Sequence, residues 1–358
     1  MQDRFQHLIQ EATRLTREGD LQAATQAIQH ALQGRQAAAG SGGDVIDVEA
    51  RVVDAPAARA LPSGGGDRPA PAPAPAPSGE EAFVPGRHGG AGTAGRDYKL
   101  FVPAQPAQPG ALVLMLHGCT QGPDDFAAGT RMNDLARERG WHVLYPAQAQ
   151  CANSHRCWNW FKHSHQQRGR GEAALLAGMV REVVQRYGID PGRVFVAGLS
   201  AGGAMAAILG QAYPELFAAV GVHSGLPAGA ARDLPGALEA MKNGASPPVG
   251  AGASLPTIVF HGDADRTVHP ANGEHVVRAA AAAGEAQTEP VQGRGRRATR
   301  RVYRDAAGRV LAEHWLVHGA GHAWMGGSAA GSYTDPSGPD ASREMVRFFE
   351  EQLARKAS

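Results

Sequence analysis

The sequence predicts an α/β protein with a doubly wound, mostly parallel sheet, and two observations support this. Short apolar runs of strand length alternate with longer segments of helical pattern between residues 96 and 356. One of the runs, residues 111–116, is apolar at every position, which is typical of a central parallel strand buried on both faces. A chain of 358 residues with 43% hydrophobic content is also long enough to bury one large core and a second element.

The elements of this fold follow one another in a regular order. Residues 97–103 alternate and end at a proline, so we expect an edge strand there. Residues 131–139 read as a helix and residues 142–146 as the next strand. A long helix at residues 171–187 then leads into another apolar run, at residues 194–197.

The pentapeptide directly after this run predicts a catalytic nucleophile. Gly198-Leu199-Ser200-Ala201-Gly202 separates the run from an Ala-, Leu- and Met-rich segment that is typical of a helix. Strand, tight turn and helix form the nucleophile elbow, which holds a serine in a strained conformation above the sheet. Any Cβ at the flanking glycines would clash with a neighbouring element. The alternative is a plain Gly-rich strand–helix turn, and we favour Ser200 as nucleophile.

A serine nucleophile needs an acid and a base, which an α/β-hydrolase places after successive later strands. The apolar run at residues 257–260 is followed by Asp263 and Asp265. Either carboxylate is able to form a side-chain-to-backbone turn, the usual role of Asp in such loops. We favour Asp265 as the acid because it lies deeper in the loop and can reach towards a histidine.

The base is expected after the next strand, at residues 313–317. Among His261, His269, His318 and His322, we favour His322, because Gly319 and Gly321 allow its loop to bend over the serine, and we expect most of the others to be structural. His318 lies directly after the strand and is expected to point into the scaffold.

Two backbone amides are predicted to form an oxyanion hole. One belongs to Ala201, directly after the nucleophile, and the other follows an earlier strand. The run at residues 111–116 ends at His117-Gly118-Cys119, where Gly118 allows the turn that presents the Cys119 amide to the pocket. We expect a structural role for His117.

These motifs carry a family resemblance that extends from about residue 95 to about residue 353. The sequence resembles the polyhydroxybutyrate (PHB) depolymerase family of esterases, with the type 1 catalytic domain of short-chain polyhydroxyalkanoate depolymerases. The resemblance implies an α/β-hydrolase fold, a Ser200–Asp265–His322 triad, and Cys119 and Ala201 as oxyanion donors. Five motifs occur in the family's order: Leu116-His117-Gly118-Cys119-Thr120-Gln121, Cys157-Trp158-Asn159-Trp160-Phe161, Gly198-Leu199-Ser200-Ala201-Gly202, His261-Gly262-x-x-Asp265 and Gly319-x-Gly321-His322-Ala323-Trp324.

Three tryptophans are candidates for the substrate site. Trp158, Trp160 and Trp324 lie in loops next to the expected catalytic elements, which favours a rim or an acyl pocket over the alternative of a core role. The resemblance also implies that the segment around Trp158 and Trp160 borders the cleft. Met325 departs from the Pro or Ser that many relatives carry after this tryptophan.

The expected function is hydrolysis of short-chain poly(3-hydroxyalkanoate) or hydroxybutyrate esters by a serine esterase, through an acyl-enzyme. Feruloyl and acetylxylan esterases share the same scaffold, so a carbohydrate esterase is the alternative. The alternative from another class is an inactive hydrolase-like binding protein. For the expected esterase, the substrate is an ester or a polyester.

The chain divides into three expected regions. Residues 1–34 have the pattern of one tetratricopeptide-like helical hairpin, which needs a partner for its apolar face. Residues 35–95 are rich in Gly, Ala and Pro and are expected to be a disordered linker, and residues 96–356 form the catalytic domain. The hairpin is expected to dock on a granule surface or a protein partner.

Composition excludes several other classes. The 35 basic and 34 acidic residues nearly cancel, so we expect no nucleic-acid partner. No apolar stretch is long enough for a transmembrane segment. No cluster has metal-ligand spacing, and we expect neither a metal nor a cofactor. The N-terminus lacks the pattern of a signal peptide, so we expect a cytoplasmic, granule-associated protein, with an extracellular location as the alternative.

The three cysteines leave at least one thiol unpaired. Cys151 with Cys157 and Cys119 with Cys157 are both candidate pairs. Free thiols are the default expectation in a reducing compartment.

Overall fold

The structure is a computed structural model that describes residues 79–89, 95–245, 255–281, 285–292 and 295–356. The expected hairpin at residues 1–34 and most of the expected linker lie outside the described residues.

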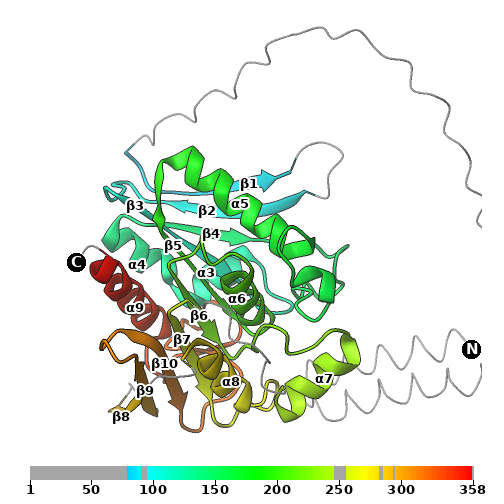
Figure 1. Cartoon of the computed structure of the whole chain (residues 1–358). Helices are drawn as coiled ribbons and strands as arrows, with labels where there is room; N and C mark the ends of the chain where they lie inside the picture. The colour runs from blue at the N-terminus through cyan, green and yellow to red at the C-terminus, as the bar shows by residue number, and fades with distance from the viewer. Residues whose placement is uncertain (1–78, 90–94, 246–254, 282–284, 293–294, 357–358) are drawn as a thin grey trace, which may run out of the picture. The chain divides into compact units, whose positions relative to one another are not determined.

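One ten-stranded sheet forms the centre of the described chain, in the order β1-β2-β4-β3-β5-β6-β7-β10-β9-β8 (Figure 1). The six central strands, from β4 to β10, run parallel, and antiparallel strands continue the sheet at both ends. The expectation of a mostly parallel sheet is confirmed. The strand bounds are β1 Ala82–His88, β2 Arg96–Val102, β3 Gly110–Leu116, β4 His142–Pro146, β5 Ile189–Leu199, β6 Ala219–His223, β7 Thr257–Gly262, β8 Glu285–Gln292, β9 Arg297–Arg304 and β10 Val310–Val317.

Helices cover both faces of this sheet. Along β3, Leu112 and Leu114 pack into the core on one face, while Val113 and Met115 pack into the core on the other. The first core is completed by α5 to α8 and the second by α3, α4 and α9, which makes the sheet doubly wound. The helices are α3 Pro123–Thr130, α4 Met132–Arg139, α5 Gly171–Tyr187, α6 Ala201–Ala212, α7 Leu234–Asn243, α8 Ala271–Ala280 and α9 Ala341–Lys356, with a short 3-10 helix at His163–His165 and a second small sheet of β11 Trp324–Met325 and β12 Thr334–Asp335.

The structure corrects the expected start of the catalytic domain. Residues 82–88, assigned to the linker by composition, form β1, which pairs along its whole length with β2. The ring of Phe83 packs edge-on against Tyr145 at 5.7 Å. At Gly86 a Cβ would lie 2.3 Å from the Tyr98 ring, so only glycine fits beside that ring. The expected edge strand, β2, is therefore an inner strand between β1 and β4.

Four parallel strands bring the predicted catalytic segments to one edge of the sheet. Parallel strands end at the same edge, and ligands of open α/β sheets bind there. The loops after β3, β5, β7 and β10 carry, in this order, the Cys119, Ser200, Asp265 and His322 positions. Among the described helices, none is both long enough and apolar enough to cross a membrane.

Candidate active site

Ser200 lies at a strained turn between β5 and α6. Its backbone has φ 57° and ψ −119°, a combination that side-chain-bearing residues rarely adopt. The amide of Ser200 donates to the carbonyl of His223 at the end of β6, at 2.9 Å, which holds the turn against the neighbouring strand. A Cβ at Gly198 would lie 2.4 Å from Gly202, and one at Gly202 would lie 2.0 Å from the Leu116 carbonyl oxygen. The expected need for both glycines is confirmed.

His322 and Asp265 are brought together by the loops after β10 and β7. The Nδ1 atom of His322 lies 2.7 Å from Oδ2 of Asp265, and the carboxylate has no exposed side-chain surface. The other carboxylate oxygen accepts the amides of Thr267 and Val268, each at 2.9 Å. No hydrogen bond joins Ser200 Oγ to His322 among the described residues, as is common for catalytic contacts before substrate binds.

The charge on Asp265 fixes the tautomer of its histidine. Burial raises the pKa of Asp265, but His261 and His322 beside it bring that pKa well below its usual range. An ionised carboxylate only accepts hydrogen bonds, so Nδ1 of His322 carries a proton, and in the neutral ring this leaves the lone pair on Nε2. His261 donates from Nε2 to the carbonyl of Val268 at 2.9 Å and keeps the loop in place behind Asp265.

The residues weighed as alternatives, Asp263 and His318, form a second pair. His318 Nδ1 lies 2.8 Å from Asp263 Oδ2, and the Gly319 amide donates to the same carboxylate at 2.7 Å. The side chains are 41% and 37% exposed, in contrast to the buried pair beneath. His318 therefore lies at the surface, where Thr299 contacts its Nε2 at 2.9 Å, and the expectation that it points into the scaffold is wrong.

Two backbone amides beside Ser200 are free to bind an anion. Within the described residues, neither the Cys119 nor the Ala201 amide donates a hydrogen bond. Ala201 is the first residue of α6, so its amide also lies at the positive end of a helix dipole. In the loop after β3, Thr120 has a positive φ, at 65°.

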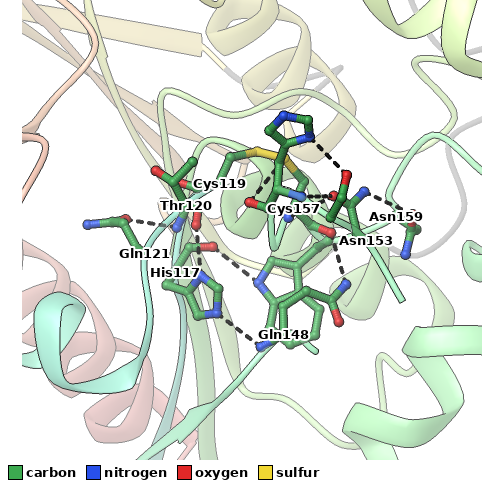
Figure 2. The surroundings of a disulfide bond; sticks show 12 residues. His117, Cys119, Thr120, Gln121, Gln148, Asn153, Cys157 and Asn159 are labelled. Carbon is green, nitrogen blue, oxygen red and sulfur yellow. Dashed lines mark hydrogen bonds between the residues drawn. A yellow bond between two sulfur atoms is a disulfide. The ribbon is translucent and has the colours of Figure 1, made fainter. Parts of the chain in front are cut away.

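A dense set of hydrogen bonds holds the loop of Cys119. The Gly118 amide donates to Oε1 of Gln121 at 2.9 Å, and the Thr120 amide donates to the carbonyl of His155 at 2.7 Å. His117 is buried, and burial lowers its pKa to about 4. Its Nε2 accepts the Gln148 amide at 3.1 Å, so the ring is neutral and structural, as expected (Figure 2).

A disulfide joins this loop to the segment before α5. Cys119 and Cys157 are bonded to each other (Figure 2). Cys151 is an exposed free cysteine. The Cys119–Cys157 pair is therefore the correct one of the two candidates. The default expectation of free thiols is wrong for these two residues.

A cavity of about 1110 Å³ opens above Ser200 and is lined by Cys119 and Ala201. One wall is the α7 helix, whose Leu234 and Leu238 are 55% and 59% exposed. The segment before α5 also lines the cavity, with residues that include Trp160, Phe161, Lys162 and His163. A large pocket lined by apolar and polar side chains, with a strained serine in its lining, is a typical binding site for a small ligand.

Of the three predicted tryptophans, Trp160 lines the cavity and the other two belong to the core. Trp158 is fully buried, and its Nε1 donates to the His117 carbonyl at 3.1 Å. Trp324 is buried against Phe126 on one side and His223 on the other. The structure corrects the expectation of a cleft role for Trp158 and Trp324, because both rings are used in packing.

Sequence patterns did not indicate two groups that shape the site. Glu172 has no signal beyond that of an acid in a first helical turn, yet its carboxylate is buried beside the cavity wall. The exposed leucines of α7 lie on either side of Pro235 in a Gly- and Ala-rich stretch, where no motif marks them.

Comparison with known proteins agrees with this geometry. The family profile described as Esterase PHB depolymerase matches residues 96–283, which is more than half of the chain. The chain belongs to this esterase family. Among its relatives, poly(3-hydroxyalkanoate) depolymerase C of Paucimonas lemoignei is 33% identical over 235 residues, covering 62% of this chain and 56% of the relative. Poly(3-hydroxybutyrate) depolymerase of Ralstonia pickettii is 36% identical over 143 residues, covering 37% and 29%.

A solved relative supports the fold assignment. The acetyl xylan esterase from Aspergillus awamori superposes with a TM-score of 0.58 at 21% identity, covering 75% of this chain and 99% of that one. The expected α/β-hydrolase fold is confirmed, and so is the expected class, since relatives of this family are carboxylic ester hydrolases by name. The chain spans little more than half the length of the first of the curated relatives.

Proposed function

We propose that the protein is a serine esterase that cleaves esters of short-chain 3-hydroxyalkanoic acids. The observation that carries this proposal is the hydrogen bond between a buried, ionised Asp265 and His322, in loops at the same sheet edge as the strained Ser200. Further support comes from the two free amides, Cys119 and Ala201, which line the same cavity as the serine.

In the proposed reaction, Ser200 Oγ attacks the ester carbonyl while His322 Nε2 takes the serine proton. Asp265 holds the imidazole in the required tautomer and stabilises the imidazolium. The developing oxyanion accepts hydrogen bonds from the Cys119 and Ala201 amides. His322 then returns the proton to the leaving alcohol, and water hydrolyses the acyl-enzyme by the same route.

The test is hydrolysis of p-nitrophenyl butyrate by matched pairs of variants. Ser200→Ala and His322→Gln are expected to lower kcat by a factor on the order of 10⁴–10⁶. His318→Gln is the control, because His318 makes an equivalent pair with Asp263 at the surface. Near-normal hydrolysis by Ser200→Ala would overturn the proposal, as would equal losses in His318→Gln and His322→Gln.

The cavity walls support a hydroxyalkanoate as the acyl group. Leu234 and Leu238 offer apolar surface to a methyl-bearing chain. Lys162 and Arg232 also line the cavity, and neither forms an ion pair with a carboxylate among the described residues. The only acid in the lining, Asp233, caps α7 by accepting the Gly236 amide at 2.8 Å. This excess of positive charge favours oligomers that carry a free terminal carboxylate.

A second candidate is an acetylxylan-type carbohydrate esterase, which the similarity to the Aspergillus awamori enzyme favours. A substrate panel separates the two. We expect higher kcat/KM for the free acid of a hydroxybutyrate trimer than for its methyl ester, and lower values for acetylated xylo-oligosaccharides and feruloylated sugars. A preference for the sugar esters would replace the first candidate by the second.

We also propose that the N-terminal region tethers the enzyme to a polyester granule. A long Pro- and Ala-rich segment between a docking unit and an enzyme raises the local substrate concentration. Because β1 belongs to the catalytic domain, a truncation must end before residue 79. Deleting residues 1–78 is expected to weaken retention on PHB granules and to leave p-nitrophenyl butyrate hydrolysis unchanged. Equal loss of both activities would contradict the tether.

The disulfide bears on the proposed location. Disulfides persist in oxidising compartments and are rare in the cytoplasm. The Cys119–Cys157 bond therefore favours the extracellular alternative over the cytoplasmic location expected from the N-terminus. Cell fractionation with an antibody to the natural protein tests this, and recovery in the cytoplasmic fraction alone would contradict it.

A further inference from the structure

The segment between β4 and α5 forms one wall of the cavity and has almost no regular secondary structure. Apart from the three residues of the 3-10 helix, residues 147–170 are turns and loops. The same segment carries Cys157, which is bonded to the oxyanion loop at Cys119. Whatever fixes this segment therefore also fixes the position of the Cys119 amide.

One buried carboxylate accepts hydrogen bonds from two residues of this segment, Gln148 and Asn159. Glu172, in the first turn of α5, is 3% exposed. Its Oε2 accepts the backbone amide of Asn159 at 2.7 Å, and its Oε1 accepts Nδ2 of the same residue at 2.8 Å. Oε1 also accepts Nε2 of Gln148 at 2.6 Å. Burial raises the pKa of Glu172, but the imidazole of His165, 3.6 Å away, and the hydrogen bonds from Gln148 and Asn159 bring that pKa below its ordinary value, so the carboxylate is ionised.

The partners of Glu172 lead directly to the oxyanion loop. Besides its bond to Glu172, the side chain of Gln148 donates to the Cys157 carbonyl at 2.9 Å, and its backbone amide donates to His117 (Figure 2). Trp158, between the disulfide and Asn159, donates to the His117 carbonyl at 3.1 Å. Hydrogen bonds from Glu172 thus lead through Gln148 to His117. They also lead through Gln148 and the disulfide to Cys119, on the other side of Gly118.

We propose that Glu172 is a positioning residue that sets the place of the Cys119 amide through Gln148, Asn159 and the disulfide. The role rests on the proposed function, in which this amide binds the oxyanion. Glu172 neither lines the cavity nor contacts Ser200, so it does not bind substrate. Displacing the Cys119 amide weakens the binding of the transition state more than the binding of the ester, since only the transition state carries the full negative charge.

The variant Glu172→Gln keeps the shape of the side chain and removes the charge. Its amide nitrogen must then face one of the donors from Asn159 or Gln148, which loosens the segment. We expect kcat for p-nitrophenyl butyrate to fall on the order of 10-fold to 100-fold, with KM changed by less than about 2-fold. Affinity for a butyl trifluoromethyl ketone, whose serine adduct places an oxyanion in the hole, should fall by the same factor as kcat/KM.

Glu313→Gln is the matched control. Glu313 is equally buried, and it accepts hydrogen bonds from Arg300 and Arg347 on β9 and α9. Its loss is expected to lower the melting temperature without lowering ketone affinity. If Glu172→Gln does not fold, Gln148→Met decides the question, because it removes the Nε2 donor and keeps the backbone bond to His117.

The outcomes separate the role of Glu172 from the proposed function. Parallel losses in kcat and ketone affinity, at constant KM, support the proposal. A loss of stability with unchanged kcat and ketone affinity in the variant that folds would overturn it. Hydrolysis by Ser200→Ala at the wild-type rate would instead overturn the proposed function, whatever Glu172 does.

Discussion

The substitution Asp265→Asn tests the geometry of the site, because it changes which ring nitrogen of His322 carries the proton. In the wild type, Oδ1 accepts the Thr267 and Val268 amides and Oδ2 accepts His322 Nδ1. If the Asn oxygen keeps the two amides, its NH₂ group faces His322 and forces the imidazole into the other tautomer. Turning the amide round would leave two buried N–H groups unpaired, at a cost of roughly 1–3 kcal/mol each. The wrong tautomer is therefore the favoured outcome.

His322 then carries its proton on Nε2 and cannot accept one from Ser200. A buried Asp→Asn change of this kind lowers kcat about 10⁴-fold in a serine triad, which corresponds to roughly 5 kcal/mol of transition-state stabilisation. The assay is steady-state hydrolysis of p-nitrophenyl butyrate, with melting temperatures to confirm that each variant is folded. Asp263→Asn is the control and should retain kcat within a few-fold. A kcat of Asp265→Asn within tenfold of the wild type would refute the reasoning.

Three further predictions concern stability and redox state. Burial lowers the pKa of both His117 and His142 to about 4, so the unfolded chain takes up protons before the folded chain does as the pH falls below about 6.5. The free energy of unfolding, measured by urea titration, should therefore decrease from pH 6.5 to pH 4 by up to about 1.4 kcal/mol per pH unit for each histidine, and His142→Leu should reduce this slope. A free energy of unfolding that does not change with pH in this window would contradict the prediction. Gly202→Ala should destabilise the fold by at least about 3 kcal/mol, because its Cβ would lie 2.0 Å from the Leu116 carbonyl, while Gly321→Ala, which has open space, should match the wild type in urea denaturation. Unreduced, denatured protein should show one thiol to Ellman's reagent, from Cys151; three thiols would rule out the disulfide.

The central strands could be predicted from the sequence because a strand that is buried on both faces has a continuous run of apolar residues. The run that became β3 is apolar throughout, and β5 and β7 have similar runs. The outer strand β8, with the sequence EAQTEPVQ, has no apolar run, since it is almost wholly exposed. Its extended form depends on pairing with β9, which no local pattern encodes.

The same distinction applies to the site. The placement of Ser200, Asp265 and His322 at one edge of the sheet could be predicted, because each residue follows a recognisable strand in a motif with few structural solutions. The burial of Trp158 could not be predicted, because the local sequence around a loop tryptophan does not show whether its ring faces the cleft or the core. Glu172 contacts Gln148 across 24 positions of sequence, and only the folded chain brings them together.

The proposed reaction requires that Ser200 is an activated nucleophile. The most direct measurement is labelling of the full chain with a fluorophosphonate probe, followed by digestion and mass spectrometry. We expect one adduct, on the peptide that contains Ser200, with labelling lost in Ser200→Ala and His322→Gln and retained in His318→Gln. An unlabelled wild-type protein, or an adduct on any other residue, would contradict it.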